Sequence, residues 1–217
     1  MLQRSANTAD VNGSAFKGRP RNTPKHQAAI DAARELFASD GLYATSMDAI
    51  AQKAGVAKVT LYSHFEDKNA LYVAVVRQLG SRRVPGDVFE LQDKETFSGR
   101  LSKIAEAVFD FSMAPESTQL IRLLTGSERS ASDLSQLFWD SGSDLLLSKL
   151  AAFFAQAWTR RKQETHLPRK AAELFYFSLI GEAFLRKAMG LPFDLTPLQR
   201  REHLDSVVTL FTNELHR

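Results

Sequence analysis

Six closely spaced side chains combine hydroxyl, phenol, imidazole and ammonium groups with one small apolar group: Lys58, Val59, Thr60, Tyr62, Ser63 and His64. Hydroxyl groups can bond base edges or phosphates, ammonium and phenol groups can bond phosphate oxygens, and short side chains permit close approach to a groove. Lys68 adds a cation at the start of the next expected helix, where free backbone N–H groups also favour an anion. These groups are suited to recognising a polyanion rather than to making or breaking bonds.

The elements that must position these side chains form a helix-turn-helix pattern. Thr45 to Asp48 is a capping-box arrangement that opens a helix through Lys53, and 54–56 is a tight turn containing a glycine. A short helix from about Lys58 to Phe65 follows. The apolar residues that hold the pair together are Ile50, Ala51, Val56, Leu61 and Phe65. This motif places its second helix in the DNA major groove, so we predict DNA recognition. A helical interaction protein that uses the motif only as a scaffold is the alternative.

Helical spacing of apolar residues continues along the chain, so we predict an all-α fold. Thr23 and Pro24 start a helix that stops at Gly41, and a helix over 68–79 is expected to end at Gly80. After a loop over 81–95, further helices are expected at about 96–113, 116–130, 132–162, 168–189 and 196–215. The sequence shows no sustained alternation typical of strands.

The run Gly-Val-Ala-Lys-Val-Thr-Leu-Tyr-Ser-His-Phe-Glu-Asp-Lys-Asn-Ala-Leu over 55–71 resembles the recognition segment of the TetR (tetracycline-repressor) family. Phe37, Gly41, Thr45 and Ile50-Ala51 fall where that family has its Phe, Gly, Thr and Ile-Ala. The resemblance implies a ligand-responsive transcriptional regulator, usually a repressor, that is a homodimer on near-palindromic double-stranded DNA. It implies three parts: a flexible basic arm (1–22), a three-helix helix-turn-helix DNA-binding domain (23–80), and a larger helical ligand-binding and dimerisation domain (81–217).

The resemblance also implies residue roles. Family members touch DNA at the positions matching Lys58, Val59, Thr60, Tyr62, Ser63, His64 and Lys68, and the position matching Thr45 lies close to the DNA backbone. Two departures alter the expected details. Ala57 stands where a Ser or Thr commonly caps the recognition helix, which removes a cap worth about 1 kcal/mol. Val59 replaces a frequent Gly, and its methyl groups can contact a thymine methyl instead.

The expected helix over 168–189 is apolar on nearly every side, which is more than one flank of a monomer readily buries. In the resembling family the last two long helices of each subunit form a four-helix dimer interface. The candidate interface residues are Phe177, Ile180, Phe184, Leu204, Val207, Val208 and Phe211. A purely internal core is the alternative.

The ligand pocket is less strongly indicated by the sequence. Candidate lining residues are Phe109, Met113, Leu124, Trp139, Phe153 and Trp158, each of which fits a core position better than a pocket wall. Because few charged residues interrupt these helices, a pocket there would take an apolar or aromatic small molecule of unknown identity.

Enzymatic, metal and cofactor chemistry find no support in the residues. The chain has no cysteine, and its five histidines are scattered without a metal-binding spacing. Paired acid–base or nucleophile motifs are absent from the sequence, so we expect no enzyme, metal or cofactor. No apolar run approaches the roughly 20 residues that span a bilayer, and we expect a cytoplasmic protein with no membrane partner.

The net charge of +3 lies in the arm, where Arg4, Lys17, Arg19 and Arg21 face only Asp10. Lys17-Gly18-Arg19-Pro20-Arg21 resembles arms that read A·T-rich minor grooves. A solubilising tail with unspecific attraction to phosphate is the alternative.

Overall fold

The structure, a computed structural model, describes residues 23–92, 95–119, 131–160 and 167–213. Within these ranges the chain is helical and contains no strand, which confirms the all-α prediction. The arm (1–22) and Leu124 lie outside the described residues. The helices are α1 (Pro24–Asp40), α2 (Met47–Lys53), α3 (Lys58–His64), α4 (Lys68–Arg83), the 3-10 helix η1 (Gly86–Phe89), α5 (Phe97–Met113), α7 (Ala131–Phe138), the π-helix η2 (Trp139–Ser143), α8 (Asp144–Arg160), α9 (Pro168–Ala188) and α10 (Pro197–Asn213).

Local capping explains where the first helices begin. The side chains of Thr23, Ser46 and Asp67 accept hydrogen bonds from backbone N–H groups three residues later, at 3.2, 3.1 and 2.7 Å. Each cap satisfies a donor that the first turn of a helix leaves free. The start of α3 has no side-chain cap, because Ala57 occupies that position. The recognition helix therefore depends on its packing rather than on a cap.

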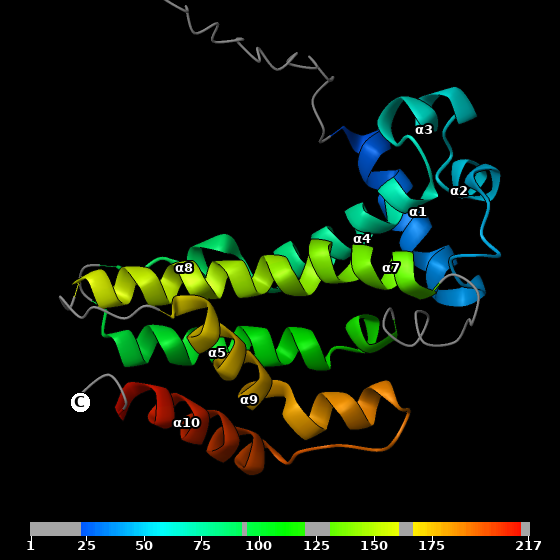
Figure 1. Cartoon of the computed structure of the whole chain (residues 1–217). Helices are drawn as coiled ribbons and strands as arrows, with labels where there is room; N and C mark the ends of the chain where they lie inside the picture. The colour runs from blue at the N-terminus through cyan, green and yellow to red at the C-terminus, as the bar shows by residue number, and fades with distance from the viewer. Residues whose placement is uncertain (1–22, 93–94, 120–130, 161–166, 214–217) are drawn as a thin grey trace, which may run out of the picture.

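The structure differs from the sequence prediction at two glycines. Gly80 does not end α4: the N–H of Val84 still bonds the Gly80 carbonyl at 2.8 Å, and the helix runs on to Arg83, before Pro85. Gly181 does interrupt α9, because its backbone leaves helical geometry at φ 20 and ψ −121. Figure 1 shows the resulting bend within α9. Glycine permits both outcomes, and the packing around each position decides between them.

Two hydrophobic clusters organise the molecule. One joins α1 to α4, with Phe37, Leu61 and Tyr72 among its most deeply buried members. The other joins α5, α8, α9 and α10, and Phe111 packs against both clusters. In Figure 1, α1, α2 and α3 gather at one end of the molecule, and α4 runs from them along the helices of the second cluster. Helix α4 is therefore one element through which a change in the second cluster can reach the first three helices.

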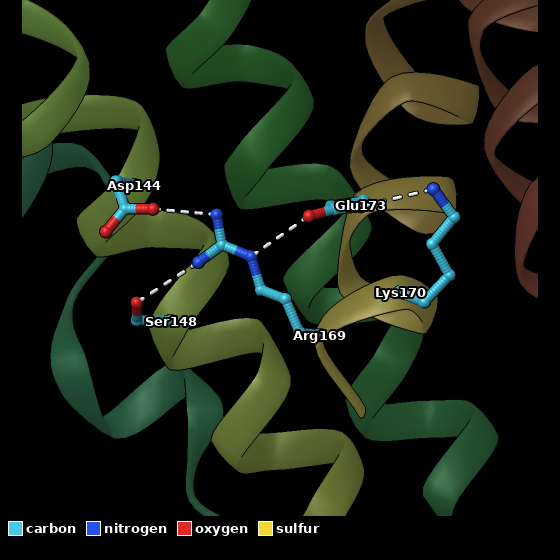
Figure 2. A network of polar contacts seen from close by, with 5 residues as sticks. All are labelled: Asp144, Ser148, Arg169, Lys170 and Glu173. Atoms are coloured by element: carbon cyan, nitrogen blue, oxygen red, sulfur yellow. Dashed lines mark hydrogen bonds and ion pairs between the residues drawn. The ribbon is translucent and has the colours of Figure 1, made fainter. Parts of the chain in front are cut away.

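Arg169 ties the N-terminal turn of α9 to α8 (Figure 2). Its guanidinium donates to Asp144 Oδ1 at 2.7 Å, to Ser148 Oγ at 3.3 Å and to Glu173 Oε1 at 3.2 Å. The hydrogen bond to Asp144 raises the pKa of Arg169, and the hydrogen bond from Arg169 lowers the pKa of Glu173. Asp144 directly follows the π-helix, so this network joins α9 to the place where η2 becomes α8. No helix among the described residues is long and apolar enough to cross a membrane.

Candidate nucleic-acid interface and ligand cavity

Helix α3 presents its polar face to solvent, because Leu61 and Phe65 anchor the opposite side in the first cluster. Val59 is 81% exposed and Tyr62 is 45% exposed. The structure brings together six of the residues proposed from the sequence on this helix: Lys58, Val59, Thr60, Tyr62, Ser63 and His64, of which Thr60 and His64 are half-buried and the others exposed. A short helix with such a face can enter a major groove.

Two polar side chains of this face already have partners. Lys58 Nζ lies 2.7 Å from Asp48 Oδ1, and this hydrogen-bonded carboxylate raises the pKa of Lys58. Ser63 Oγ donates to the Thr60 carbonyl at 2.7 Å. A phosphate would therefore have to replace Asp48 as the partner of Lys58. Because that ion pair is exposed to water, its loss costs little.

Thr45 and Lys68 hold the chain between α1 and α2. Thr45 is 3% exposed, and its hydroxyl donates to the Gly41 carbonyl at 2.7 Å. Lys68 Nζ donates to the carbonyls of Thr45 and Tyr43 at 2.8 and 3.1 Å. Burial lowers the pKa of Lys68. In this structure both residues thus position the recognition unit, a role that the spacing of the sequence did not reveal.

His26 connects α1 to the end of α3. Its ring stacks on Phe65 at 4.8 Å between centroids and meets His64 edge-on at 5.5 Å. In the sequence, 38 positions separate His26 from His64, so their spacing gave no sign of this contact. Helix α1 and the recognition helix are thus in direct side-chain contact.

A cavity of about 350 Å³ lies between α4, α5, η2 and α8. Its volume falls in the range of small-molecule sites. Its lining combines apolar residues with glycines, serines and two cations: Val76, Arg77, Gln78, Gly80, Ser81, Val84, Phe89, Phe111, Ser141, Gly142, Leu145, Leu146 and Lys149. A smaller cavity of about 40 Å³ shares Val76, Phe111, Gly142 and Leu146 with it.

The five proposed pocket residues that the structure describes do not line this cavity. Phe109 and Phe153 are buried in the second cluster, and Met113 packs against it. Trp139 is 41% exposed, and Trp158 lines a separate apolar groove beside α9 and α10. Large side chains fill space, whereas the cavity forms beside small ones such as Gly80, Ser141 and Gly142. The small residues Ser141 and Gly142 were the signal that could have located it.

The proposed interface residues divide between the surface and the interior. Phe177 is 51% exposed, and Phe184 and Phe211 are half-buried. Ile180, Leu204, Val207 and Val208 are 3–5% exposed and belong to the core of the chain itself. The large apolar side chains that α9 and α10 leave exposed are Leu174, Phe177, Leu185, Leu198 and Leu210. Leu204, Val207 and Val208 of α10 therefore face inward, as does Ile180 of α9, so four of the proposed residues lie beneath the surface.

The described residues contain no group of three His, Asp or Glu side chains placed to hold a metal ion.

Two family models match this chain, one over its N-terminal part and one over its C-terminal part. Residues 29–75 match the family model for bacterial regulatory proteins of the tetR family. Residues 99–214 match the model for the C-terminal domain of AefR-like transcriptional repressors. The matched families and relatives are transcriptional regulators rather than enzymes.

Two curated relatives align over shorter segments. The HTH-type transcriptional activator FasR of Mycolicibacterium smegmatis is 40% identical over 92 residues, which is 42% of each chain. The HTH-type transcriptional regulator RutR of Escherichia coli K12 is 42% identical over 55 residues, 25% of this chain and 26% of RutR. The chain thus aligns with less than half the length of these relatives.

Two solved structures are similar over nearly their whole length. A putative TetR-family regulator from Mesorhizobium loti has a TM-score of 0.72 and 27% identity, with 87% of this chain and 95% of that one covered. The flavonoid-responsive regulator FrrA has a TM-score of 0.70 and 30% identity, with 88% and 96% covered.

Proposed function

The chain belongs to the TetR family of DNA-binding transcriptional regulators, and from that premise we propose that it is a homodimeric repressor released from a near-palindromic operator by a small molecule. The match of residues 99–214 to a repressor family supports the direction of control. FasR is named an activator, but it aligns over only 42% of its length.

The exposed face of α3 is the observation that carries the DNA-binding part of the proposal. In a dimer, two such helices would enter successive major grooves one helical turn apart. We assign base or phosphate contacts to the six residues of that face and positioning roles to Thr45 and Lys68. The arm residues Lys17, Arg19 and Arg21 would add contacts to phosphates or the minor groove. This assignment divides the chain into the arm (1–22), the DNA-binding domain (23–80) and the ligand-binding and dimerisation domain (81–217).

The exposed apolar residues of α9 and α10 support the dimer. Phe177 and its exposed neighbours would contact a second copy of the chain, which would remove their apolar surface from water. Ile180, Leu204, Val207 and Val208 would support this surface from beneath, and Phe184 and Phe211 would lie at its edge. Dimerisation would set the separation of the two copies of α3.

The cavity beside α4 is the proposed effector site. Helix α4 contributes to its wall through Val76 and Gln78 and begins at Lys68, which bonds the backbone leading into α2. A ligand that favours a shifted α4 would therefore change the placement of α3. Such a ligand releases DNA only if it binds the DNA-incompetent arrangement more tightly. FrrA is named flavonoid-responsive, which supports an aromatic or apolar effector body.

Selection of bound sequences from a random DNA pool tests the proposal. We expect an inverted repeat whose half-sites are one helical turn apart. Thr60→Ala and Val59→Gly should change the preferred bases, and Tyr62→Phe should weaken binding to all sequences. Ser39→Ala, at the C-terminal end of α1, is the control and should bind as the parent does. Failure to select a sequence, or unchanged binding in all three α3 variants, would overturn the proposal.

A further inference from the structure

Positive side chains without an ion pair are rare in the described part of this chain, and two of them meet at one cavity. Each lysine and arginine with a described side chain forms an ion pair or hydrogen bond except Lys25, Arg77 and Lys149. Arg77 and Lys149 both line the cavity beside α4. Arg77 comes from α4 and Lys149 from α8, so two separate elements each bring a cation to the same space.

In the described part of the chain, neither of these two cations forms an ion pair with an acidic residue. Among the described residues, none that lines the cavity is an Asp or Glu. Neither residue has an acidic residue three or four positions away on its own helix, where ion pairs along a helix form. Glu90 lines a neighbouring surface hollow together with Lys149, yet the two form no ion pair within the described part of the chain. The positive charge at the cavity is therefore not balanced from within its lining.

The rest of the lining is suited to an apolar body. Val76, Phe89, Phe111 and Leu146 supply aliphatic and aromatic surface. The ammonium of Lys149 lies 5.9 Å from the centroid of the Phe89 ring, a distance at which the ring attracts a cation. This contact holds the charge beside the apolar wall. A ligand lying against Phe89 would thus meet Lys149 with its polar end.

We propose that the effector of this cavity is an amphipathic organic anion, with an apolar or aromatic body against Val76, Phe89 and Leu146 and one anionic group between Arg77 and Lys149. This inference rests on the proposed function of the cavity as the effector site and specifies the charge of its ligand. Charge-assisted hydrogen bonds are about twice as strong as neutral ones, and arginine can engage a carboxylate, sulfonate or phosphate through two N–H groups. A neutral ligand of the same shape gains none of these contacts.

A matched pair of fluorescent probes tests the proposal on the full-length chain. One is 8-anilinonaphthalene-1-sulfonate, an aromatic body with a single sulfonate. The other is N-phenyl-1-naphthylamine, which has the same rings without the charge. Both are titrated at one fixed low ionic strength, because salt screens exposed charges. Release of the selected operator DNA is measured in parallel for each probe.

We expect the sulfonate to bind more tightly than the neutral probe, with one site per chain. Lys149→Met and Arg77→Gln should each weaken binding of the sulfonate probe by about tenfold and leave the affinity for the neutral probe nearly unchanged. Because neither side chain forms an ion pair within the described residues, both variants should melt close to the parent temperature. Lys25→Met, which removes the third cation without an ion pair among the described side chains and lies on α1 outside the cavity lining, should bind both probes as the parent does.

Equal affinity for the sulfonate probe in the parent and both cavity variants would overturn the proposal that the effector is an anion. If the neutral probe then still released DNA, the effector cavity would stand and only the charge assignment would fall. If neither probe bound while operator binding was intact, both the charge assignment and the proposed effector site would be overturned.

Discussion

Gln27 of α1 and Gln78 of α4 exchange hydrogen bonds between their side-chain amides. Gln78 Nε2 donates to Gln27 Oε1 at 2.7 Å, and Gln27 Nε2 donates to Gln78 Oε1 at 3.2 Å. Gln78 lines the cavity, and α1 reaches the recognition helix through the ring of His26. This amide pair is therefore a direct connection between the proposed effector site and the DNA-binding helices.

Removing this pair should weaken the coupling between ligand and DNA more than it weakens either binding event. Allosteric coupling typically changes an affinity by about 5–150-fold. We expect Gln27→Ala and Gln78→Ala each to reduce this effect of DNA on ligand affinity by several-fold. The measurement is the affinity for the sulfonate probe with and without saturating operator DNA.

Gln119→Ala is the matched control for the amide pair. Gln119 Nε2 also bonds α1, donating to the Ala38 carbonyl at 2.8 Å, but Gln119 does not line the cavity. For the Gln119→Ala variant, the ratio of sulfonate-probe affinities with and without operator DNA should equal the parent ratio. If all three variants gave the parent ratio, the amide pair would play no part in coupling.

Gly142 of the π-helix packs tightly against α4. A Cβ atom at this position would lie 3.1 Å from Cγ1 of Val76, which is 3% exposed. We expect Gly142→Ala to press on α4 and to lower operator affinity in the absence of any ligand. Val76→Ala removes the opposing methyl group, so the double variant should recover part of the loss, with an interaction energy of about 1 kcal/mol in a double-mutant cycle. If the two substitutions had strictly additive effects on operator affinity, the contact between Gly142 and Val76 would not carry an effect from η2 to α4.

Lys68 should act on DNA affinity through the loop that it holds. Lys68→Met leaves the carbonyls of Tyr43 and Thr45 without their donor, and we expect it to lower the free energy of unfolding by about 1 kcal/mol. Lys58→Met removes an exposed cation of α3 and should instead reduce the salt dependence of DNA binding by about one unit of slope. Urea unfolding and operator titration across salt concentrations distinguish the two. A Lys68 variant with parent stability and a reduced slope would identify a phosphate contact instead.

Phe177 should be required for dimerisation but not for folding, because it is 51% exposed in a single chain. We expect Phe177→Glu to raise the dimer dissociation constant by about a hundredfold, as loss of an aromatic anchor does, and to abolish cooperative operator binding. Light scattering after size-exclusion chromatography measures the association. Trp139→Glu alters a similarly exposed aromatic outside α9 and α10 and should leave the dimer intact. A dimeric Phe177→Glu protein would place the interface elsewhere.

Glu95 should make stability depend on pH in the acid range. A hydrogen bond from Lys103, together with the charge of Arg100, lowers the pKa of Glu95 below its ordinary value of 4.5. The folded state therefore favours the carboxylate, so the stabilisation is present above pH 4.5 and is lost as the pH falls through the lowered pKa.

Replacing Glu95 by Gln should lower the free energy of unfolding at neutral pH. It should also make that free energy fall less steeply in acid, because the glutamine side chain does not take up a proton in this pH range. Urea midpoints measured at several acid pH values test this. Glu106→Gln, on the exposed side of α5 with no ion pair in the described part of the chain, should keep the parent profile. Parallel profiles for the parent and the Glu95 variant would contradict the role of this pair.

Local signals in the sequence were sufficient for the helices and for the recognition face. The caps at Thr23, Ser46 and Asp67 and the turn at Gly55 act within a few residues, so they can be read without knowing what packs against them. The sequence alone therefore determined the all-α fold, the outward residues of α3 and the resemblance to the TetR family.

Only the tertiary structure decided which residues form the cavity and which stay on the surface. The cavity combines Arg77 and Gln78 with residues more than 60 positions later, and Gln78 finds its partner 51 residues earlier. The position of such a space depends on how small side chains meet between helices, which a periodic pattern does not encode. The same limit explains α10: Leu204, Val207 and Val208 could be identified in the sequence as apolar positions to be buried, but whether they meet a second copy or the chain's own core depends on where α5 and α9 lie.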